Sequence, residues 1–255
     1  MIVYEMVFSP TGGTKKVSDC FTRALGYEST FLDLTDPDKD FAAFSFGPED
    51  ICIAAVPSYG GRAPQPALSR LAGMKGNGAR AILVVVYGNR AYEDTFVELK
   101  DTLEKAGFSC VAGIAAIAEH SIMRQFAAGR PDEQDEKELS RFASHIRSRL
   151  EEGWKEGDLK LPGNRPYREY GGVPMKPQAG KACIRCGLCA RKCPVHAIHL
   201  DAPDQTDTKA CISCMRCVSV CPRKARSVSK MLLAAGSMKL KKASSEYKRN
   251  ELYLP

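Results

Sequence analysis

A run of four cysteines and a proline, C-x2-C-x2-C-x3-C-P, occurs twice in the chain, at residues 183–194 and again at 211–222. The two runs hold eight of the eleven cysteines. The opening letters MIVYEMVF lack the features of a secretory leader, so we expect a cytoplasmic protein whose thiols stay reduced. In such a compartment, closely spaced cysteines indicate metal ligation rather than disulfides.

The spacing also bears on which metal is bound. Pairs of the form C-x2-C occur in structural zinc sites, which are the simpler alternative. Two complete four-cysteine runs, each followed by proline, favour iron–sulfur clusters instead. The residues resemble a bacterial two-cluster ferredoxin over about 183–227, and this resemblance implies two [4Fe-4S] clusters that transfer single electrons at low potential. In that family each run gives three cysteines to one cluster and its fourth to the other. The implied ligands are Cys183, Cys186, Cys189 and Cys221 for cluster one, and Cys211, Cys214, Cys217 and Cys193 for cluster two.

The first 150 residues alternate short apolar runs with amphipathic segments. The apolar runs predict strands over 2–8, 29–34, 50–56, 79–87 and 108–118, and the segments between and after them predict helices near 14–25, 65–73, 93–106 and 132–150. Five continuous apolar strands separated by helices are typical of a parallel sheet covered on both faces. We therefore expect a doubly wound α/β domain, whose strand order the pattern does not reveal.

The letters SPTGGT follow the first predicted strand and precede the first predicted helix. Backbone N–H groups and hydroxyls at such a junction can converge on a phosphate, helped by the positive end of the helix. The segment lacks both the Walker ending and the three-glycine dinucleotide fingerprint. It resembles the phosphate loop of flavodoxins, although an ordinary turn is the alternative. The residues concerned are Ser9, Thr11, Gly12, Gly13 and Thr14.

Two further loops strengthen this resemblance, because each places a tyrosine and glycines at the carboxyl end of a predicted strand, where open α/β sheets bind ligands. The flavodoxin resemblance implies that they hold the isoalloxazine ring of FMN, and the alternative is that the tyrosines only cap the sheet. Neither loop has a tryptophan, which leaves open whether Tyr59 or Tyr92 stacks on the ring. His120, after the fifth strand, could tune a flavin, transfer a proton or simply lie on the surface. The loop residues are Pro57, Ser58, Tyr59, Gly60 and Gly61, followed by Gly88, Asn89, Arg90 and Tyr92.

The expected fold is a flavodoxin-like doubly wound five-stranded parallel sheet with a small α+β two-cluster ferredoxin domain. We place the FMN-binding domain at 1–151, a linker with six glycines and four prolines at 152–180, the ferredoxin domain at 181–227 and a basic tail at 228–255. The whole chain carries a formal net charge of +7, but residues 222–255 alone hold nine basic and two acidic side chains. We expect the tail to pack against the first domain rather than bind nucleic acid, with one short helix within 228–243.

These features predict an intracellular electron-transfer protein, with FMN and two clusters as its relay and other redox proteins as its partners. An FMN-dependent reductase of a small organic substrate, fed by the clusters, is one alternative. A redox-sensing or adapter module with an empty flavodoxin domain is another. No apolar run approaches the length of a membrane span. The sequence leaves open the oligomeric state, the partners and whether the chain is an enzyme.

Overall fold

A computed structural model describes residues 2–154 and 157–255. Met1 of the expected first domain and Lys155 and Glu156 of the expected linker lie outside the described residues. Five parallel strands form a sheet in the order β2-β1-β3-β4-β5. This is the order of flavodoxin-like doubly wound folds, so the expected fold class is confirmed. The strands are β1 (Val3–Val7), β2 (Ser29–Asp33), β3 (Ile51–Pro57), β4 (Arg80–Tyr87) and β5 (Ser109–Ile117).

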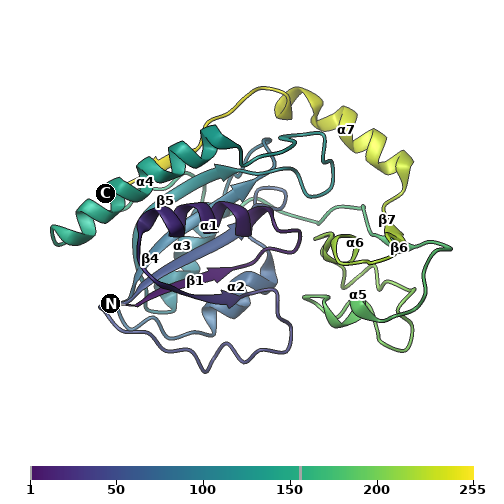
Figure 1. The fold of residues 1–255 in the computed structure, drawn as a ribbon, viewed down its shortest axis with the longest axis horizontal. Coiled ribbons are helices and arrows are strands. Elements are labelled where there is room, and N and C mark those ends of the chain that lie inside the picture. Colours follow the sequence, from purple (N-terminus) through teal and green to yellow (C-terminus); the bar gives the residue numbers. More distant parts are fainter. Residues whose placement is uncertain (1, 155–156) are drawn as a thin grey trace.

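Two helices cover each face of this sheet (Figure 1). α1 (Gly13–Leu25) and α4 (Glu133–Glu151) pack on one face, and α2 (Gln65–Ala72) and α3 (Thr95–Lys105) pack on the other. Because both faces are covered, β3 and β4 are buried almost throughout, as their continuous apolar letters predicted. The nine elements expected in this domain all begin and end within two residues of the expected positions.

The cysteine-rich segment forms a second, smaller unit with little regular structure. It holds two one-turn helices, α5 (Leu188–Arg191) and α6 (Arg216–Ser219), and an antiparallel pair, β6 (Gln178–Ala179) with β7 (Arg226–Ser227). Among the described residues, one buried apolar cluster of this unit holds Ala190, Ile198 and Cys217, and its Met215 belongs to a second cluster shared with Met123 and Phe126 of the α/β domain. A core of this size contributes little stability, which is the situation in which bound metal holds a domain together.

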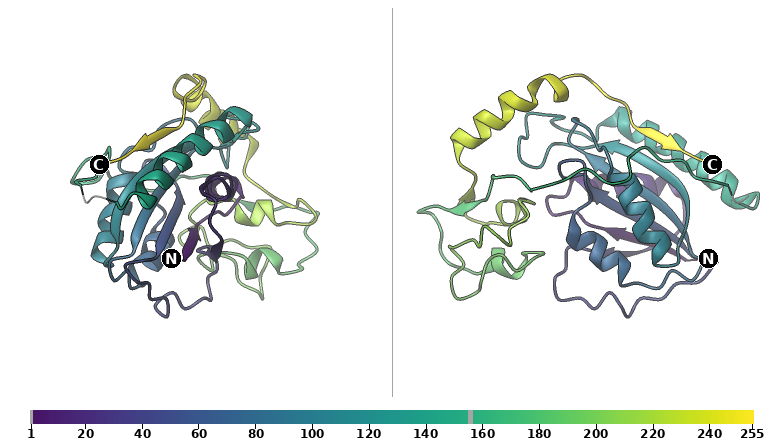
Figure 2. Two further views of the ribbon diagram at one scale, coloured as in Figure 1. Left: turned by 60° about the vertical axis from the view of Figure 1, so that its left-hand side comes forward. Right: turned by 180° about the vertical axis from the view of Figure 1, so that it is seen from behind.

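The C-terminal tail runs back along the first domain. α7 (Lys230–Ser244) arches from the cysteine-rich unit to the sheet, where β8 (Glu251–Tyr253) pairs antiparallel with β5 (Figures 1 and 2). The side chain of Asn250 secures this return: its Oδ1 accepts the N–H of Ile117 at 3.0 Å, and its Nδ2 donates to Asp135 at 2.9 Å and to Glu138 at 3.0 Å. The expected helix is present, whereas the sixth strand was not predicted.

The linker also lies against the first domain. The backbone N–H groups of Asn164 and Arg168 donate to the two carboxylate oxygens of Asp94, at 2.8 and 2.7 Å, and the Nε of Arg165 donates to Asp101 at 2.8 Å. These bonds fix the described part of the linker along the start and middle of α3. Among the helices described, none combines the length and the apolar character needed to cross a membrane.

Candidate functional site

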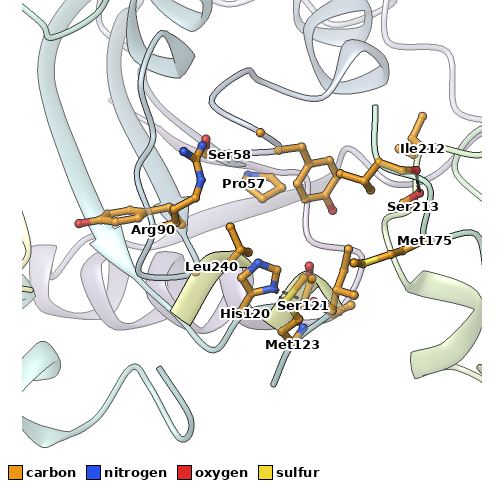
Figure 3. A pocket seen from close by; sticks show the side chains of 18 of the residues that line it. Pro57, Ser58, Arg90, His120, Ser121, Met123, Met175, Ile212, Ser213 and Leu240 are labelled. Atoms are coloured by element: carbon orange, nitrogen blue, oxygen red, sulfur yellow. Dashed lines mark hydrogen bonds between the residues drawn. The ribbon is translucent and has the colours of Figure 1, made fainter. Parts of the chain in front are cut away.

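A cavity of about 610 Å³ lies at the carboxyl ends of the parallel strands, between the two units. Its volume is in the range of small-molecule and cofactor sites. The loops after β1, β3, β4 and β5 form one side, while the linker and α7 form others. Ile212 and Ser213, which lie between two cysteines of the second run, complete the wall, and Figure 3 shows them facing the same space as Pro57 and His120.

One end of the cavity is the N-terminus of α1. Gly12 stands before this helix with φ at +94°, a left-handed conformation that favours glycine, and as a glycine it offers no side chain to cap the helix. The Oγ of Ser9 accepts the N–H of Lys15 at 2.9 Å, which shapes the loop. A neighbouring cavity of about 600 Å³ adds the cationic side chains of Lys16 and Lys224. Helix N–H groups beside cations suit a phosphate.

The structure brings most of the predicted loop residues together, but not all of them. Those that line the 610 Å³ cavity are Thr11, Gly13, Thr14, Pro57, Ser58, Tyr59, Gly60, Gly88 and Arg90. Ser9, Gly12, Gly61, Asn89 and Tyr92 are not part of its lining. Gly12 borders the neighbouring cavity instead, and the carbonyl of Gly61 accepts the N–H of Asp94 at 3.0 Å.

Tyr92 and Asn89 contact the C-terminal tail. The Tyr92 hydroxyl donates to Glu251 and lies 2.8 Å from the hydroxyl of Tyr253, and its ring packs edge-on against its aromatic neighbours Tyr87 and Phe96. The Nδ2 of Asn89 donates to the carbonyls of Ser244 and Glu246, both at 2.8 Å. These contacts hold the Tyr92 side chain outside the lining of the 610 Å³ cavity, whereas Tyr59, the other tyrosine predicted to stack on a ligand, lines it.

Two other aromatic side chains line the cavity. Tyr59 follows β3, and Tyr170 comes from the linker. A Cβ placed on Gly60 would collide with the ring of Tyr170, so the glycine permits this close approach. Burial, followed by the nearby Cys214 and Tyr170, raises the pKa of Tyr59 well above its usual range. Tyr59 thus lines the cavity and is close to Cys214 of the second cysteine run. Sequence reasoning missed Tyr170 because it stands in a Gly- and Pro-rich segment without periodicity.

His120 is held in one orientation at the cavity wall (Figure 3). Its Nδ1 accepts the backbone N–H groups of Ile122 and Met123, both at 3.2 Å. A ring nitrogen that accepts hydrogen bonds carries no proton, so these bonds assign the proton to Nε2. Burial, and then the charge of Arg90, lower the pKa of His120, which keeps the ring neutral. A neutral imidazole with a free Nε2–H can donate one hydrogen bond to a ligand.

The eight clustered cysteines gather around two small cavities of about 20 Å³ each. Backbone N–H groups point at several of the sulfurs: Ala197 N lies 3.3 Å from Cys193 Sγ, and Ala225 N lies 3.2 Å from Cys221 Sγ. Although burial opposes it, such backbone donors lower the pKa of Cys221. N–H donors to sulfur stabilise thiolates and tune cluster potentials. One cavity is lined by Cys183, Cys186, Cys189 and Cys221, and the other by Cys193, Cys211, Cys214 and Cys217.

These two groups are the same sets that the ferredoxin resemblance implied. Each set draws three cysteines from one run and one from the other, as reciprocal ligation requires. Within the described residues, no three His, Cys, Asp or Glu side chains lie at the spacing of a single metal ion. A four-iron cluster is larger than an ion and holds its thiolates further apart. The donor set of four cysteines suits such a cluster.

Comparisons with known families and structures found matches in two parts of the chain. Residues 182–225 match the family described as 4Fe-4S dicluster domain. A search of curated proteins found no match. Solved structures similar to the first domain include a flavodoxin of Streptococcus pneumonia TIGR4, at 19% identity over 58% of this chain and 99% of that one, with a TM-score of 0.43. Others are Flavodoxin 1 of Bacillus cereus (14%, 58% and 98%, TM-score 0.41) and a Fusobacterium nucleatum flavodoxin bound to flavin mononucleotide (15%, 57% and 95%, TM-score 0.39). These values are too low to assign a fold, which follows here from the chain's own strand order.

The dicluster segment is joined directly to the loops around the cavity. Nη1 of Arg216, two residues after Cys214, donates to the carbonyls of Ser9 and Pro10 at 3.4 and 3.3 Å. Nη2 of Arg70, on α2, donates to the carbonyl of Pro194 at 2.7 Å. The chain thus combines a flavodoxin-like α/β domain with a ferredoxin-type segment, and Pro194 and Arg216, which stand next to Cys193 and Cys217 of the second set, both contact the α/β domain.

Proposed function

We propose that this protein transfers electrons between an FMN bound in the 610 Å³ cavity and two [4Fe-4S] clusters bound by the two cysteine sets. One observation carries the proposal: Ile212 and Ser213, between Cys211 and Cys214, line the same cavity as the phosphate loop and the loops after β3 and β4. FMN exchanges one or two electrons and each cluster exchanges one, so a shared wall brings the two kinds of chemistry together.

The residues of the cavity fit FMN. The N-terminus of α1, with Thr11, Gly13 and Thr14, would hold the phosphate. Tyr59 and Tyr170 offer aromatic faces to a flat ring, and the Nε2–H of His120 offers a hydrogen bond. Leu232, Gly236 and Leu240 of α7 cover the cavity and limit the access of water.

The first experiment is an anaerobic purification with iron, sulfide and flavin quantified per chain. We expect about eight irons, eight sulfides and one FMN, and stepwise reduction should then place electrons on both kinds of centre. Eight irons without FMN, even after reconstitution, would contradict the proposal. That result would favour the alternative of an adapter module whose flavodoxin-like domain holds no flavin. Steady reduction of a quinone or nitro compound faster than free FMN supports would favour a reductase instead.

A matched pair of glycine variants tests the cavity itself. A Cβ on Gly88 would lie 2.7 Å from the Cδ2 of His120, whereas a Cβ on Gly73 would meet its nearest atom at 3.5 Å. Gly88→Ala should therefore displace the wall and weaken FMN binding about tenfold, a loss near 1.4 kcal/mol. Gly73→Ala should leave FMN binding unchanged, and both variants should keep their iron. Equal FMN affinities in the two variants would place the flavin elsewhere.

A further inference from the structure

The two cysteine sets differ in how they meet solvent. Cys193, Cys214 and Cys217 of the second set are buried, and the loop around them contacts the α/β domain. In the first set Cys186 is exposed, and Cys183 and Cys189 are partly exposed. Under the proposed function, on which this inference rests, cluster two is next to the flavin cavity and cluster one is the centre that an external protein can approach.

The surface around Cys186 has an apolar centre. Ile184 and Leu200 are large aliphatic residues, yet they are 61% and 60% exposed. Ile184 lines the cavity of the first cysteine set, and the methyl Cδ2 of Leu200 lies 3.4 Å from a Cβ placed on Gly187. Exposed aliphatic side chains beside a redox centre provide the apolar middle of a small contact surface.

Basic side chains surround this centre. Arg185 and Arg223 line the same cavity, and Arg191 donates from Nη2 to the carbonyl of Cys186 at 3.1 Å. The ion pairs of the described residues include a long one between Arg185 and Asp204, at 3.4 Å, and none made by Arg191 or Arg223. We define the cluster-one face as Ile184, Arg185, Cys186, Arg191, Leu200 and Arg223.

The net charge of the whole dicluster segment is also positive. Residues 181–227 hold nine basic and three acidic side chains. Each oxidised four-iron cluster with its thiolates contributes about two negative charges, which leaves the segment slightly positive. A positive face steers and orients a negatively charged partner, and small, weakly bound interfaces suit electron carriers that must leave after each transfer.

We propose that the cluster-one face binds an acidic one-electron carrier protein, and that electrons enter or leave the chain there. In each productive encounter the carrier is oxidised by one electron and the chain is reduced by one, or the reverse. No bond forms or breaks at that step. Cluster two then connects cluster one with the cavity.

The test uses the full holoprotein and, as probe, an acidic bacterial two-cluster ferredoxin. Binding is measured between the two oxidised proteins, which exchange no electrons, so the Kd reports docking without any change of potential. At low salt, Arg185→Glu and Arg223→Glu should each raise the Kd at least fivefold. Lys242→Glu, an equal charge change on the exposed side of α7, should leave it within twofold. The differences should disappear at high ionic strength.

Two further measurements test whether charge, rather than loss of a cluster, causes the change in Kd. Arg185→Gln and Arg223→Gln give smaller effects of the same sign if charge is responsible, and iron content verifies that each variant keeps its clusters. Equal Kd values for the Arg185, Arg223 and Lys242 variants would overturn the proposal, as would tighter binding of a basic cytochrome than of the acidic probe. The docking measurement needs only the iron–sulfur segment, so it can give a positive result even if the protein proves to lack FMN. A failure of the docking proposal can therefore be told apart from a failure of the proposed function.

Discussion

At the scale of single residues, His120 can be tested by two isosteric replacements. In Asn the side-chain oxygen can take the place of Nδ1 and accept from Ile122 and Met123, whereas in Gln the amide nitrogen can take the place of Nε2 and donate into the cavity. If His120 donates to the flavin, His120→Asn should weaken FMN binding about fivefold, the worth of one hydrogen bond near 1 kcal/mol. His120→Gln should retain most of the affinity. Fluorescence titration with FMN measures both.

The pH dependence provides the control for this residue. The pKa of His120 is lowered from the ordinary 6.5, by burial first and then by Arg90. The folded state therefore prefers the neutral ring, and its advantage is present above pH 6.5 and lost as the pH falls through the lowered pKa. The free energy of unfolding of the natural chain, measured by denaturant titration, should fall as the pH drops through that range, and His120→Gln should show no such fall. Equal affinity losses in the Asn and Gln variants would assign His120 to loop structure alone.

At the scale of secondary-structure elements, α7 and β8 together cross the first domain: α7 covers the cavity and β8 pairs with β5. Asn250 accepts from Ile117 and donates to Asp135 and Glu138, and all of these bonds are buried. Asn250→Ala should therefore lower the free energy of unfolding by about 1–3 kcal/mol, since it leaves buried polar groups without partners. FMN should also dissociate faster, because α7 covers the cavity. Denaturant titration and stopped-flow release measure the two effects. Arg249→Ala, at an exposed neighbouring residue, is the control, and equal losses in both variants would contradict this role.

The elements differ in how far the sequence could predict them. β3 and β4 were predicted well because a strand buried on both faces is apolar throughout. The two cysteine sets were implied by the resemblance to two-cluster ferredoxins, whose ligation pattern the repeated spacing matches. β8 has only three residues and no pattern, and its pairing with β5 joins positions more than 130 residues apart. The hydrogen-bond partners of Tyr92 and the position of Tyr170 also depend on contacts between residues that are far apart in the sequence. The local sequence does not encode such contacts.

At the scale of the whole molecule, the two units should respond differently to the loss of iron. The α/β domain has extensive apolar clusters on both faces of its sheet, whereas the dicluster segment buries few apolar side chains. A chelator with a reductant should therefore unfold residues 181–227 and leave the first domain folded. Hydrogen exchange should become fast in that segment while β4 stays protected. Because Ile212 and Ser213 form part of the cavity wall, FMN should bind about tenfold more weakly, near 1.4 kcal/mol. An unchanged FMN affinity after complete iron removal would contradict this prediction. It would show that FMN binding does not depend on the folded dicluster segment, so that the two redox centres share no structural element.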